Sequence, residues 1–408
     1  MFPRSLTRRD LAGGAIATLA ASRARAATPL RIGVLTEMGG PYAEDSGRGS
    51  VAAAQFAIDD FRRDHGGPAV ELVFADAQTK PDIASAVASA WFDRDGVDMI
   101  IDVPVSNCAL AVATVARARN KVAILNTSTS ALTGAACSPN HVHWAFDTYA
   151  LARSTTRALM AEGGDRWFLI QADYTFGATL AAEATASITA GGGRVIGTVK
   201  HPFPGTTDFS SYLLAAQASG ANVIGLANAG SDAANCIKQA GEFGITQGGI
   251  RLAAMQCLLP SIVGIGAAAA AGLYLTESFY WNADAGTRLF ADRFASAMPG
   301  TRPCMIHAGC YSGVLHYLKA VAVVGVDAAK ADGAALVAAM KALPTDDPLF
   351  GRGRIRVDGR KLHDMHLYRV KPAGTVMDPW DIYDLVGSTP SDQAFRPMGE
   401  GGCPLVPA

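Results

Sequence analysis

The chain has 408 residues, of which 50% are hydrophobic and 17% are charged, and its formal net charge is −1 at pH 7. This charge balance gives no basic face for nucleic acid, and the apolar content suffices for two hydrophobic cores at the usual domain size. Beyond the first residues there is no uninterrupted run of about 20 apolar residues, so we expect no membrane-spanning helix.

The first residues have the pattern of an export signal. Arg8 and Arg9 are adjacent, a mildly apolar stretch follows over 11–21, and Ala-Arg-Ala at 24–26 forms a candidate cleavage site. This order of basic, apolar and small-residue regions is typical of a secretory signal. The arginine pair favours the twin-arginine route over the general secretory route. We therefore expect residues 1–26 to be removed and the mature chain to reside in the periplasm.

From residue 30 onward, short apolar runs that predict strands alternate with longer segments of helical periodicity. The first series predicts strands over 30–36, 70–75, 99–103 and 121–126, with helices over 49–63, 82–94 (Asp82 as the cap) and 109–118. The second series predicts strands over 166–172, 194–200, 221–228, 251–256 and 272–280, with helices over 177–190, 209–220 and 232–244. Further helices are predicted over 288–298, 308–325 and 333–343. The strands lack alternation, as expected when helices cover both faces of a parallel sheet, so the pattern predicts two doubly wound α/β units.

The last part of the chain changes character. Strands are predicted over 354–359 and 365–371, and the Pro-, Gly- and Asp-rich segment after residue 371 is expected to follow the surface. None of the seven cysteines forms a C-x-x-C pair, which argues against a zinc site built on thiolates. Cys137 and Cys403 both lie in loop-like, proline-containing stretches. Because export permits disulfides, we predict a bridge between them.

Polar and aromatic side chains follow the predicted strands, where parallel strands end. In open α/β sheets, ligands bind outside the carboxyl ends of the strands, so these loops form the candidate site. They supply the candidate ligand-binding residues Tyr42, Ser106, Asn107, Thr127, Ser128, Tyr174, Phe176 and Asp232, with Phe279 and Tyr280 after a later strand.

The hydroxyl and amide groups in these loops suit a carboxylate ligand. Helix N-termini carry unpaired N–H groups and a partial positive charge, and Ser106 and Asn107 stand at the start of a predicted helix. Together with the hydroxyls of 127–130 they are predicted to bind carboxylate oxygens, while aromatic side chains from both halves cover the ligand body. The alternative is that the polar residues only cap helices and that the aromatic residues belong to the cores.

Signals for catalysis or for a cofactor are weak. The segment 264–269 (GIGAAA) resembles part of a dinucleotide loop but follows no clear strand, so a helix is predicted there. Two histidine pairs, His141 with His143 and His363 with His366, lack an accompanying carboxylate–histidine set. The chain contains no G-x-S-x-G, P-loop or H-E-x-x-H pattern. We expect no metal, no cofactor and no enzymatic activity.

Several segments together resemble a known family, the type I periplasmic binding proteins of the leucine/isoleucine/valine-binding class, which feed ABC transporters. The resemblance covers nearly the whole mature chain. It is carried by motifs within five ranges, in this order: GGPYAEDSG in 39–60, PVSNCALAV and NTSTSALT in 104–133, DYTFG in 173–183, GANVIGLANAGSD in 206–245 and MIHAGCYSG in 305–321. It implies a Venus-flytrap fold of two Rossmann-like α/β lobes joined by three crossovers. Lobe 1 would hold 29–148 and 279–347, lobe 2 would hold 149–278 and 348–386, and 387–408 would form a C-terminal tail.

The resemblance also implies roles for particular residues. Ser106 and Asn107 match the family's carboxylate loop, and Thr127 and Ser128 match its Ser/Thr loop. Phe176 stands where the family often has Tyr, and Asp232 lies near the acidic residue that meets a ligand ammonium. The acid is Asp rather than the longer Glu, and its loop contains Gly230.

The function that the resemblance implies is capture of a small-molecule ligand, an amino acid or organic acid, by a monomer that delivers it to an ABC transporter permease. The aromatic residues near the cleft favour a flat or aromatic acid over a branched aliphatic amino acid. A second hypothesis is a ligand-sensing protein for aromatic acids or amides that reports to a receptor partner. A third, an enzyme on a Rossmann-like fold, lacks the glycine-rich fingerprint that it requires.

Overall fold

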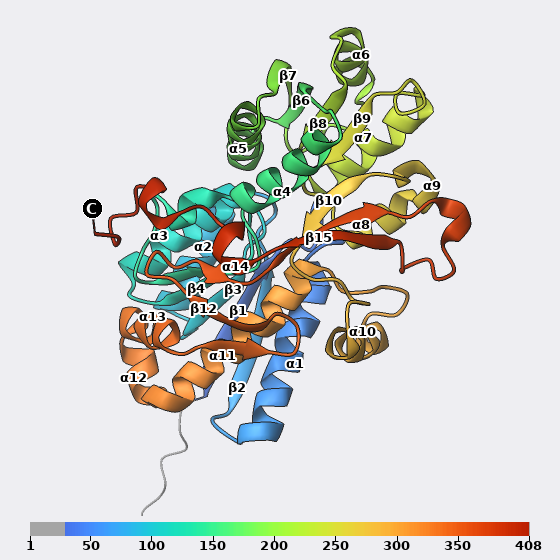
Figure 1. Cartoon of the computed structure of the whole chain (residues 1–408). Helices are drawn as coiled ribbons and strands as arrows, with labels where there is room; N and C mark the ends of the chain where they lie inside the picture. Colours follow the sequence, from blue (N-terminus) through green and yellow to red (C-terminus); the bar gives the residue numbers. More distant parts are fainter. Residues whose placement is uncertain (1–28, 408) are drawn as a thin grey trace, which may run out of the picture.

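The computed structural model describes residues 29–407, so the predicted signal over 1–26 lies outside the described residues. Two β-sheets with helices packed on their faces lie one above the other in Figure 1. We call the sheet that contains β1 and its helices the first lobe, and the sheet that contains β6 and its helices the second lobe. None of the helices within 29–407 combines the length and apolar character that a membrane crossing requires.

The first lobe is built on a five-stranded parallel sheet of order β2-β1-β3-β4-β5. Its central strands are buried on both faces, which explains their continuous apolar sequence. The strands are β1 (Leu30–Thr36), β2 (Val70–Asp76), β3 (Met99–Asp102), β4 (Val122–Leu125) and β5 (His141–His143). The helices are α1 (Gly47–His65), α2 (Pro81–Asp93), α3 (Ser106–Ala118) and, from later sequence, α11 (Met305–Val324), α12 (Val326–Ala331) and α13 (Gly333–Ala342), with the short helix η1 (Ser130–Thr133) after β4.

The second lobe has a seven-stranded sheet of order β15-β14-β10-β9-β8-β6-β7, in which β14 runs antiparallel to its neighbours β10 and β15. Its strands are β6 (Arg166–Ala172), β7 (Arg194–His201), β8 (Val223–Ala227), β9 (Arg251–Ala254), β10 (Tyr274–Glu277), β14 (Met365–Val370) and β15 (Tyr383–Thr389). Its helices are α4 (Thr148–Ala161), α5 (Thr175–Ala190), α6 (Ser210–Ala218), α7 (Gly230–Glu242), α8 (Leu259–Ile265) and α9 (Ala267–Ala270).

Short elements complete the chain. Helix α10 (Ala285–Ala297) follows β10, and β11 (Thr345–Asp347), β12 (Gly351–Ile355) and β13 (Lys361–Leu362) form a small antiparallel sheet beside the first lobe. The turn η2 (Ala373–Thr375) lies between β14 and β15, and α14 (Ser391–Ala394) and η3 (Met398–Glu400) belong to the C-terminal tail. The chain thus passes between the lobes after β5, after β10 and between β13 and β14, which agrees with three crossovers.

Buried Arg360 holds two of these crossovers together. Its guanidinium donates hydrogen bonds to the carbonyls of Trp144 and of Phe146, the latter at 2.9 Å, just before α4 begins. His363 Nε2 contacts the carbonyl oxygen of Ala145 at 2.6 Å. Burial lowers the pKa of Arg360 to about 10, so the side chain is still charged at neutral pH. We call these two crossovers, at 144–147 and 360–363, the hinge. Buried cationic and imidazole side chains bind its backbone carbonyls.

The structure contains elements that the sequence pattern did not predict. Helix α4 begins after Asp147, whose side chain accepts a hydrogen bond from Ala150 N at 2.8 Å. Its buried face includes Thr155 and Thr156, and these hydroxyl residues obscure the apolar periodicity. Strand β15 lies where a surface loop was expected, and most of its side chains are exposed because it is an edge strand. The expected cap Asp82 lies in the first turn of α2, after the N-cap Lys80.

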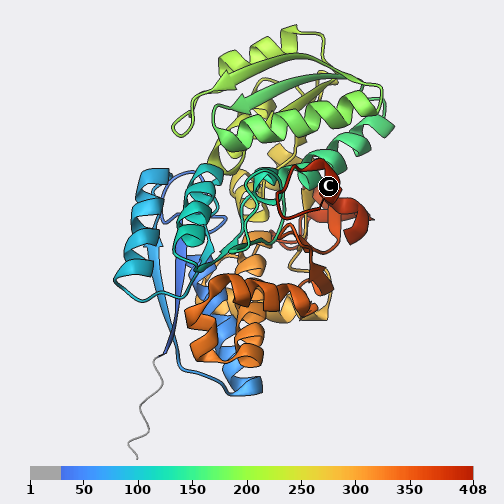
Figure 2. The same ribbon diagram turned by 90° about the vertical axis from the view of Figure 1, so that its left-hand side faces the viewer.

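The predicted disulfide is present between Cys137 and Cys403, with a Cα–Cα distance of 5.6 Å. Cys137 precedes β5 of the first lobe, and Cys403 lies in the tail that follows β15 of the second lobe. Cys236 is buried in α7, where it packs as a small apolar residue. The disulfide returns the end of the chain to the first lobe, and Figures 1 and 2 both place the tail next to the junction of the lobes.

Candidate functional site

The loop after β1 contacts the second lobe through both its backbone and its side chains. The N–H of Ser231, at the start of α7, donates to the carbonyl oxygen of Pro41 at 3.0 Å. The hydroxyl groups of Tyr42 and Tyr174 form a hydrogen bond, and Tyr174 is the N-cap of α5. The carboxyl ends of strands from both sheets therefore face one another across the junction.

Two further hydrogen bonds join the lobes at neighbouring strand ends. Ser261 in α8 donates to Asp45 Oδ1 at 3.1 Å, and Ser128 after β4 donates to Gln256 Oε1 after β9 at 2.7 Å. The side chains of Asp45, Ser128 and Gln256 are at least 98% buried. Burial raises the pKa of Asp45 to about 7, since only the hydroxyl of Ser261 stabilises its charge through a side chain. These contacts between the lobes are therefore made by desolvated polar groups.

The first lobe presents a cluster of uncharged hydroxyl groups. The Ser106 and Thr127 hydroxyl oxygens are 3.3 Å apart, and Thr127 also donates to the carbonyl oxygen of Pro104 at 2.9 Å. Ser106 is the first residue of α3, whose N-terminus has no side-chain cap. Asn107 accepts a hydrogen bond from the N–H of Cys108, so it serves the helix itself. A hydroxyl pair beside free helix N–H groups is suited to carboxylate oxygens.

The backbone beneath this cluster adopts an unusual conformation. Asp102 and Val103, directly before the PVSN loop, have φ angles of +88° and +56°. Positive φ is uncommon for non-glycine residues and is costly for a β-branched one such as Val103. His143 Nε2 lies 2.7 Å from the carbonyl oxygen of Thr127 and holds the neighbouring loop. The surrounding structure thus fixes the positions of the two hydroxyl loops, the PVSN loop at 104–107 and the loop at 127–130, of which the second is called the hydroxyl loop below.

The second lobe contributes a buried carboxyl group without a strong partner. Asp232 is 2% exposed, its Oδ2 atom has no hydrogen-bond partner, and His201 Nδ1 lies 3.8 Å away. Burial raises the pKa of Asp232 to about 7 and lowers the pKa of His201, so the pair is not held together by full charges at neutral pH. His201 also contacts the Asn228 amide at 3.3 Å, and Asn228 Oδ1 is unpaired. A cation or a donor group on an occupant would satisfy these atoms.

Four aromatic rings gather beside these groups. Tyr174 stacks on Phe203 with a centroid distance of 3.9 Å, Phe176 lies 5.8 Å from Tyr174, and Tyr42 lies 6.2 Å from Phe203. Phe203 follows β7 and was not predicted, because its proline-rich segment has the composition of a plain turn. The rings come from both lobes and pack against one another where the lobes meet.

The structure does not bring Phe279 and Tyr280 to this group. Phe279 packs edge-on against Phe290, whereas Tyr280 stacks on Tyr383 and donates to Asp381 at 2.8 Å. We therefore leave both out of the site. Both follow β10. The Tyr280 ring packs on Tyr368 of β14 as well as on Tyr383, whereas Phe290, the partner of Phe279, in turn contacts Phe56 of α1.

The histidine pairs also serve the backbone. His141 on β5 contacts the carbonyl oxygen of Leu132 at 2.8 Å, and burial lowers its pKa to about 4. Its neighbour His143 and the hinge residue His363 likewise contact carbonyl oxygens, and His366 contacts the Ser388 hydroxyl. Among residues 29–407, no group of three or more His, Cys, Asp or Glu is arranged to hold a metal ion. The segment 264–269 lies in the short helices α8 and α9.

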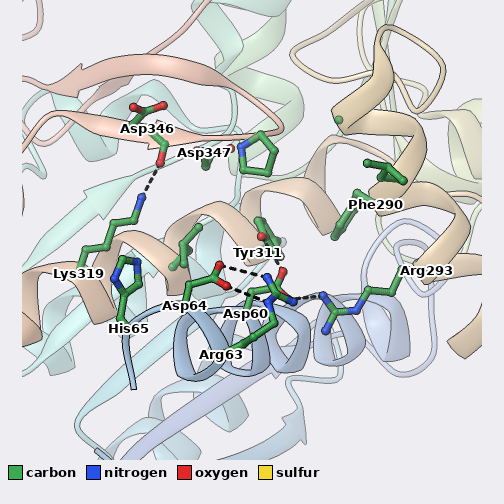
Figure 3. Close-up of a pocket in the computed structure, with 14 residues that line it drawn as sticks. Asp60, Arg63, Asp64, His65, Phe290, Arg293, Tyr311, Lys319, Asp346 and Asp347 are labelled. Atoms are coloured by element: carbon green, nitrogen blue, oxygen red, sulfur yellow. Dashed lines mark hydrogen bonds and ion pairs between the residues drawn. The ribbon is translucent and has the colours of Figure 1, made fainter. Parts of the chain in front are cut away.

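A separate cavity of about 490 Å³ lies on the outer side of the first lobe, between α1, α10 and α11 (Figure 3). Its charged groups pair with one another: Asp60 accepts from Arg63, Arg293 and Tyr311 at 2.6–2.8 Å. Lys319 donates to the backbone of Asp346. Because these contacts already satisfy the polar lining, the cavity does not compete with the strand-end loops as a candidate ligand site.

Comparison with known proteins agrees with this geometry. The family described as periplasmic binding protein matches residues 29–375. No curated protein matches the chain significantly. A periplasmic binding protein from Burkholderia mallei is 40% identical, with a TM-score of 0.88 over 92% of this chain and 99% of that chain. A branched-chain amino acid ABC transporter periplasmic ligand-binding protein from Burkholderia xenovorans LB400 is 38% identical, with a TM-score of 0.81 over the same shares.

A more distant structure shares the fold alone. The solute-binding protein of an ABC transporter from Rhodopseudomonas palustris HaA2, in complex with p-hydroxybenzoic acid, is 22% identical. Its TM-score is 0.77, and the match covers 89% of this chain and 98% of that chain.

Gly230 provides a test of how the lobes meet. A Cβ atom at this position would lie 2.1 Å from the carbonyl oxygen of Pro41 in the other lobe, and the φ angle of Gly230 is +56°. We expect Gly230→Ala to hold the lobes apart, giving a larger radius of gyration in small-angle X-ray scattering. Gly220→Ala is the matched control, because Gly220 also has positive φ but nothing lies within 4 Å of its Cβ position. Both variants should lose about 1 kcal/mol of stability from the backbone conformation. Equal radii would contradict the predicted contact.

Asp232 should make stability depend on pH. Its folded pKa of about 7 exceeds its ordinary value of 3.8, so the folded state binds the proton more tightly. The contribution of Asp232 to stability is therefore complete at low pH and is lost as pH rises through about 4 to 7. We expect Asp232→Asn to match the parent near pH 4 and to exceed it by about 1–3 kcal/mol at pH 8 in denaturant unfolding. Other buried acids contribute equally to both proteins. The exposed Asp384→Asn is the control, and a difference that does not vary with pH would contradict the prediction.

Proposed function

This chain belongs to the type I periplasmic binding protein family, and we propose that it captures an amino acid or a related small carboxylate between its lobes and delivers it to an ABC transporter permease. The observation that carries this proposal is the meeting of strand ends from both lobes at buried polar groups with open hydrogen-bonding capacity. A ligand favours closure only through contacts with both lobes, and both lobes supply such groups here.

One end of the proposed ligand is a carboxylate bound by the first lobe. The Ser106 hydroxyl and the N-terminus of α3 supply donors without introducing a positive side chain. Thr127, whose own proton goes to the carbonyl oxygen of Pro104, holds its hydroxyl oxygen beside Ser106. Hydrogen bonds to a charged acceptor are stronger than neutral ones, and desolvation by the closed lobes strengthens them further. Asn107 and Ser128 flank this position. Asn107 accepts a hydrogen bond from the N–H of Cys108 in the first turn of α3, and Ser128 donates to Gln256 of the other lobe.

The other end of the proposed ligand meets Asp232 in the second lobe. Without a ligand, this carboxyl group bears the cost of burial with no compensating charge, which is why its pKa lies near 7. A ligand ammonium beside it would restore the ionised form and gain an ion pair. The family consists of substrate-binding proteins rather than enzymes, and the convergent groups are arranged to hold a ligand by contacts alone.

A second ligand class is favoured by the aromatic rings. Tyr42, Tyr174, Phe176 and Phe203 offer faces and edges to a planar ring, and an aromatic carboxylate would use the same hydroxyl cluster. In that case the protonated carboxyl of Asp232 would act as a donor, as its raised pKa allows near pH 7. The arginine pair at the start of the sequence supports export to the periplasm for either ligand class.

Calorimetric titration with a panel of L-amino acids, aromatic carboxylates and amides tests the function and separates the two ligand classes. For an amino acid ligand, Asp232→Asn should weaken binding by about 100-fold, because an ammonium would lose its charged partner in a buried site. For an aromatic acid, the same variant should stay within about threefold of the parent, since an amide also donates. Failure of every compound in the panel to bind would overturn the proposed ligand classes.

The carboxylate contact has its own test. We expect Ser106→Ala to weaken a carboxylate ligand by about ten- to hundredfold, the usual range for losing a hydrogen bond to a charged group. Affinity for the corresponding amide should change less. Ser296→Ala is the control, because this exposed serine on α10 donates to the backbone of its own helix. An unchanged dissociation constant for Ser106→Ala would remove Ser106 from the site.

A further inference from the structure

The C-terminal tail, residues 390–407, runs back from the second lobe onto the first. The family match ends at residue 375, before this segment. Its end is fixed to the first lobe by the Cys137–Cys403 disulfide. Phe395 is 3% exposed and packs under the Arg360 guanidinium at 4.4 Å and against His363 at 5.3 Å. The tail is therefore anchored at the hinge as well as by the disulfide.

The residue after Phe395 reaches the candidate site. Arg396 donates to the carbonyl oxygen of Ser130 at 2.9 Å, and its guanidinium lies 3.7 Å from Glu183 in α5. The Ser130 hydroxyl donates to the same Glu183 carboxylate at 2.9 Å. These three side chains, which we call the Arg396 cluster, join the tail, the hydroxyl loop of the first lobe and a helix of the second lobe.

Each partner of Arg396 belongs to an element that carries candidate ligand residues. Ser130 follows Thr127 and Ser128 in the hydroxyl loop, and α5 begins with the aromatic residues Tyr174 and Phe176. The hydroxyl loop is otherwise held by a few side-chain contacts, such as Thr148 Oγ1 with the N–H of Ser130 at 3.2 Å. A residue that fixes Ser130 therefore acts on the groups proposed to bind the ligand.

We propose that the disulfide-anchored tail is a positioning element of ligand capture, in which Arg396 orders the hydroxyl loop and joins it to α5 when the lobes are closed. This inference rests on the proposed function for its effect on ligand, but the ordering of the loop is independent of it. Closing the lobes brings Glu183 to Ser130 and Arg396, and opening them separates α5 from both. The cluster thus slows opening, and with it the release of ligand.

The energetics fit a role in geometry rather than in bulk stability. Burial raises the pKa of Glu183 even though Ser130 and Arg396 both act to lower it. The desolvation of the carboxylate therefore outweighs what the Ser130 hydrogen bond and the Arg396 ion pair gain, as can happen for buried pairs. The remaining effect is geometric. The planar guanidinium of Arg396 contacts one carbonyl oxygen and one carboxylate in fixed directions, so it fixes the position of Ser130 relative to Glu183.

Hydrogen–deuterium exchange of the full-length, ligand-free protein tests the ordering directly. We expect Arg396→Ala to speed exchange in 126–133 by about tenfold, the size expected when a hydrogen bond from a charged donor is lost locally. The double variant Cys137→Ser/Cys403→Ser should also speed exchange in 126–133 by about tenfold. The exchange rate of Arg396→Lys should lie between those of Arg396→Ala and the parent. Arg119→Ala is the matched control, because its ion pair with Asp93 lies within the first lobe and on the surface.

The effect on ligand is measured by stopped-flow tryptophan fluorescence with L-leucine and 4-hydroxybenzoate as probes. Arg396→Ala should raise the dissociation rate about tenfold and leave the association rate within about twofold, as expected for a contact formed after closure. Unchanged exchange in 126–133, or an equal rise across the whole chain, overturns the inference. If neither probe binds, the proposed ligand classes fail while the exchange result still decides the role of the tail.

Discussion

Closure of this protein depends on polar groups that leave water where the two lobes meet. Four side chains at this junction are at least 98% buried in this structure: Ser106, Thr127, Ser128 and Asp232. A buried donor or acceptor without a partner costs about 1–3 kcal/mol, so each needs a partner within its own lobe, across the junction or on an occupant. Ser128 finds Gln256, whereas Asp232 Oδ2 finds no hydrogen-bond partner. In the proposed function, this difference defines the group that a ligand would supply, because closure around an unsuitable molecule would leave the carboxyl group uncompensated.

The hinge and the tail form one continuous structure around this junction. Arg360 binds the carbonyls of the first crossover, Phe395 packs on Arg360, and Arg396 reaches the hydroxyl loop. The disulfide to Cys137 makes the tail a fourth covalent connection between the lobes, beside the three crossovers. Motion of the lobes must therefore take place against a hinge whose carbonyls are already bound. This arrangement favours a small number of defined lobe orientations over unrestricted rotation of one lobe relative to the other.

Much of the fold is encoded in local sequence, and the site is encoded there in part. Strands 30–36 and 166–172 were predicted to the residue, because buried parallel strands are continuous apolar runs. The hydroxyl loops and Asp232 became candidates from the sequence because each lies directly after the carboxyl end of a strand, and the structure confirms that position but does not test their role. Phe203 was not predicted to belong to the site, because the composition of a proline-rich turn does not indicate that its aromatic ring stacks on another. Arg396 and Ser130 are 266 residues apart, and no periodicity links residues so distant in the chain. Such partners are set by tertiary packing alone.

Strand β15 has a consequence for the behaviour of the protein in concentrated solution. No strand of the described chain lies beyond β15, and its exposed Leu385 and Val386 stand beside unpaired backbone groups. Such an edge is a template onto which a strand from a neighbouring molecule can add, the first step toward ordered aggregation. The exposed carboxylate of Asp384 and the irregular register between Leu367 and Tyr368 of β14 oppose this addition. The charge that limits such association is thus carried by a residue that takes no part in holding the ligand.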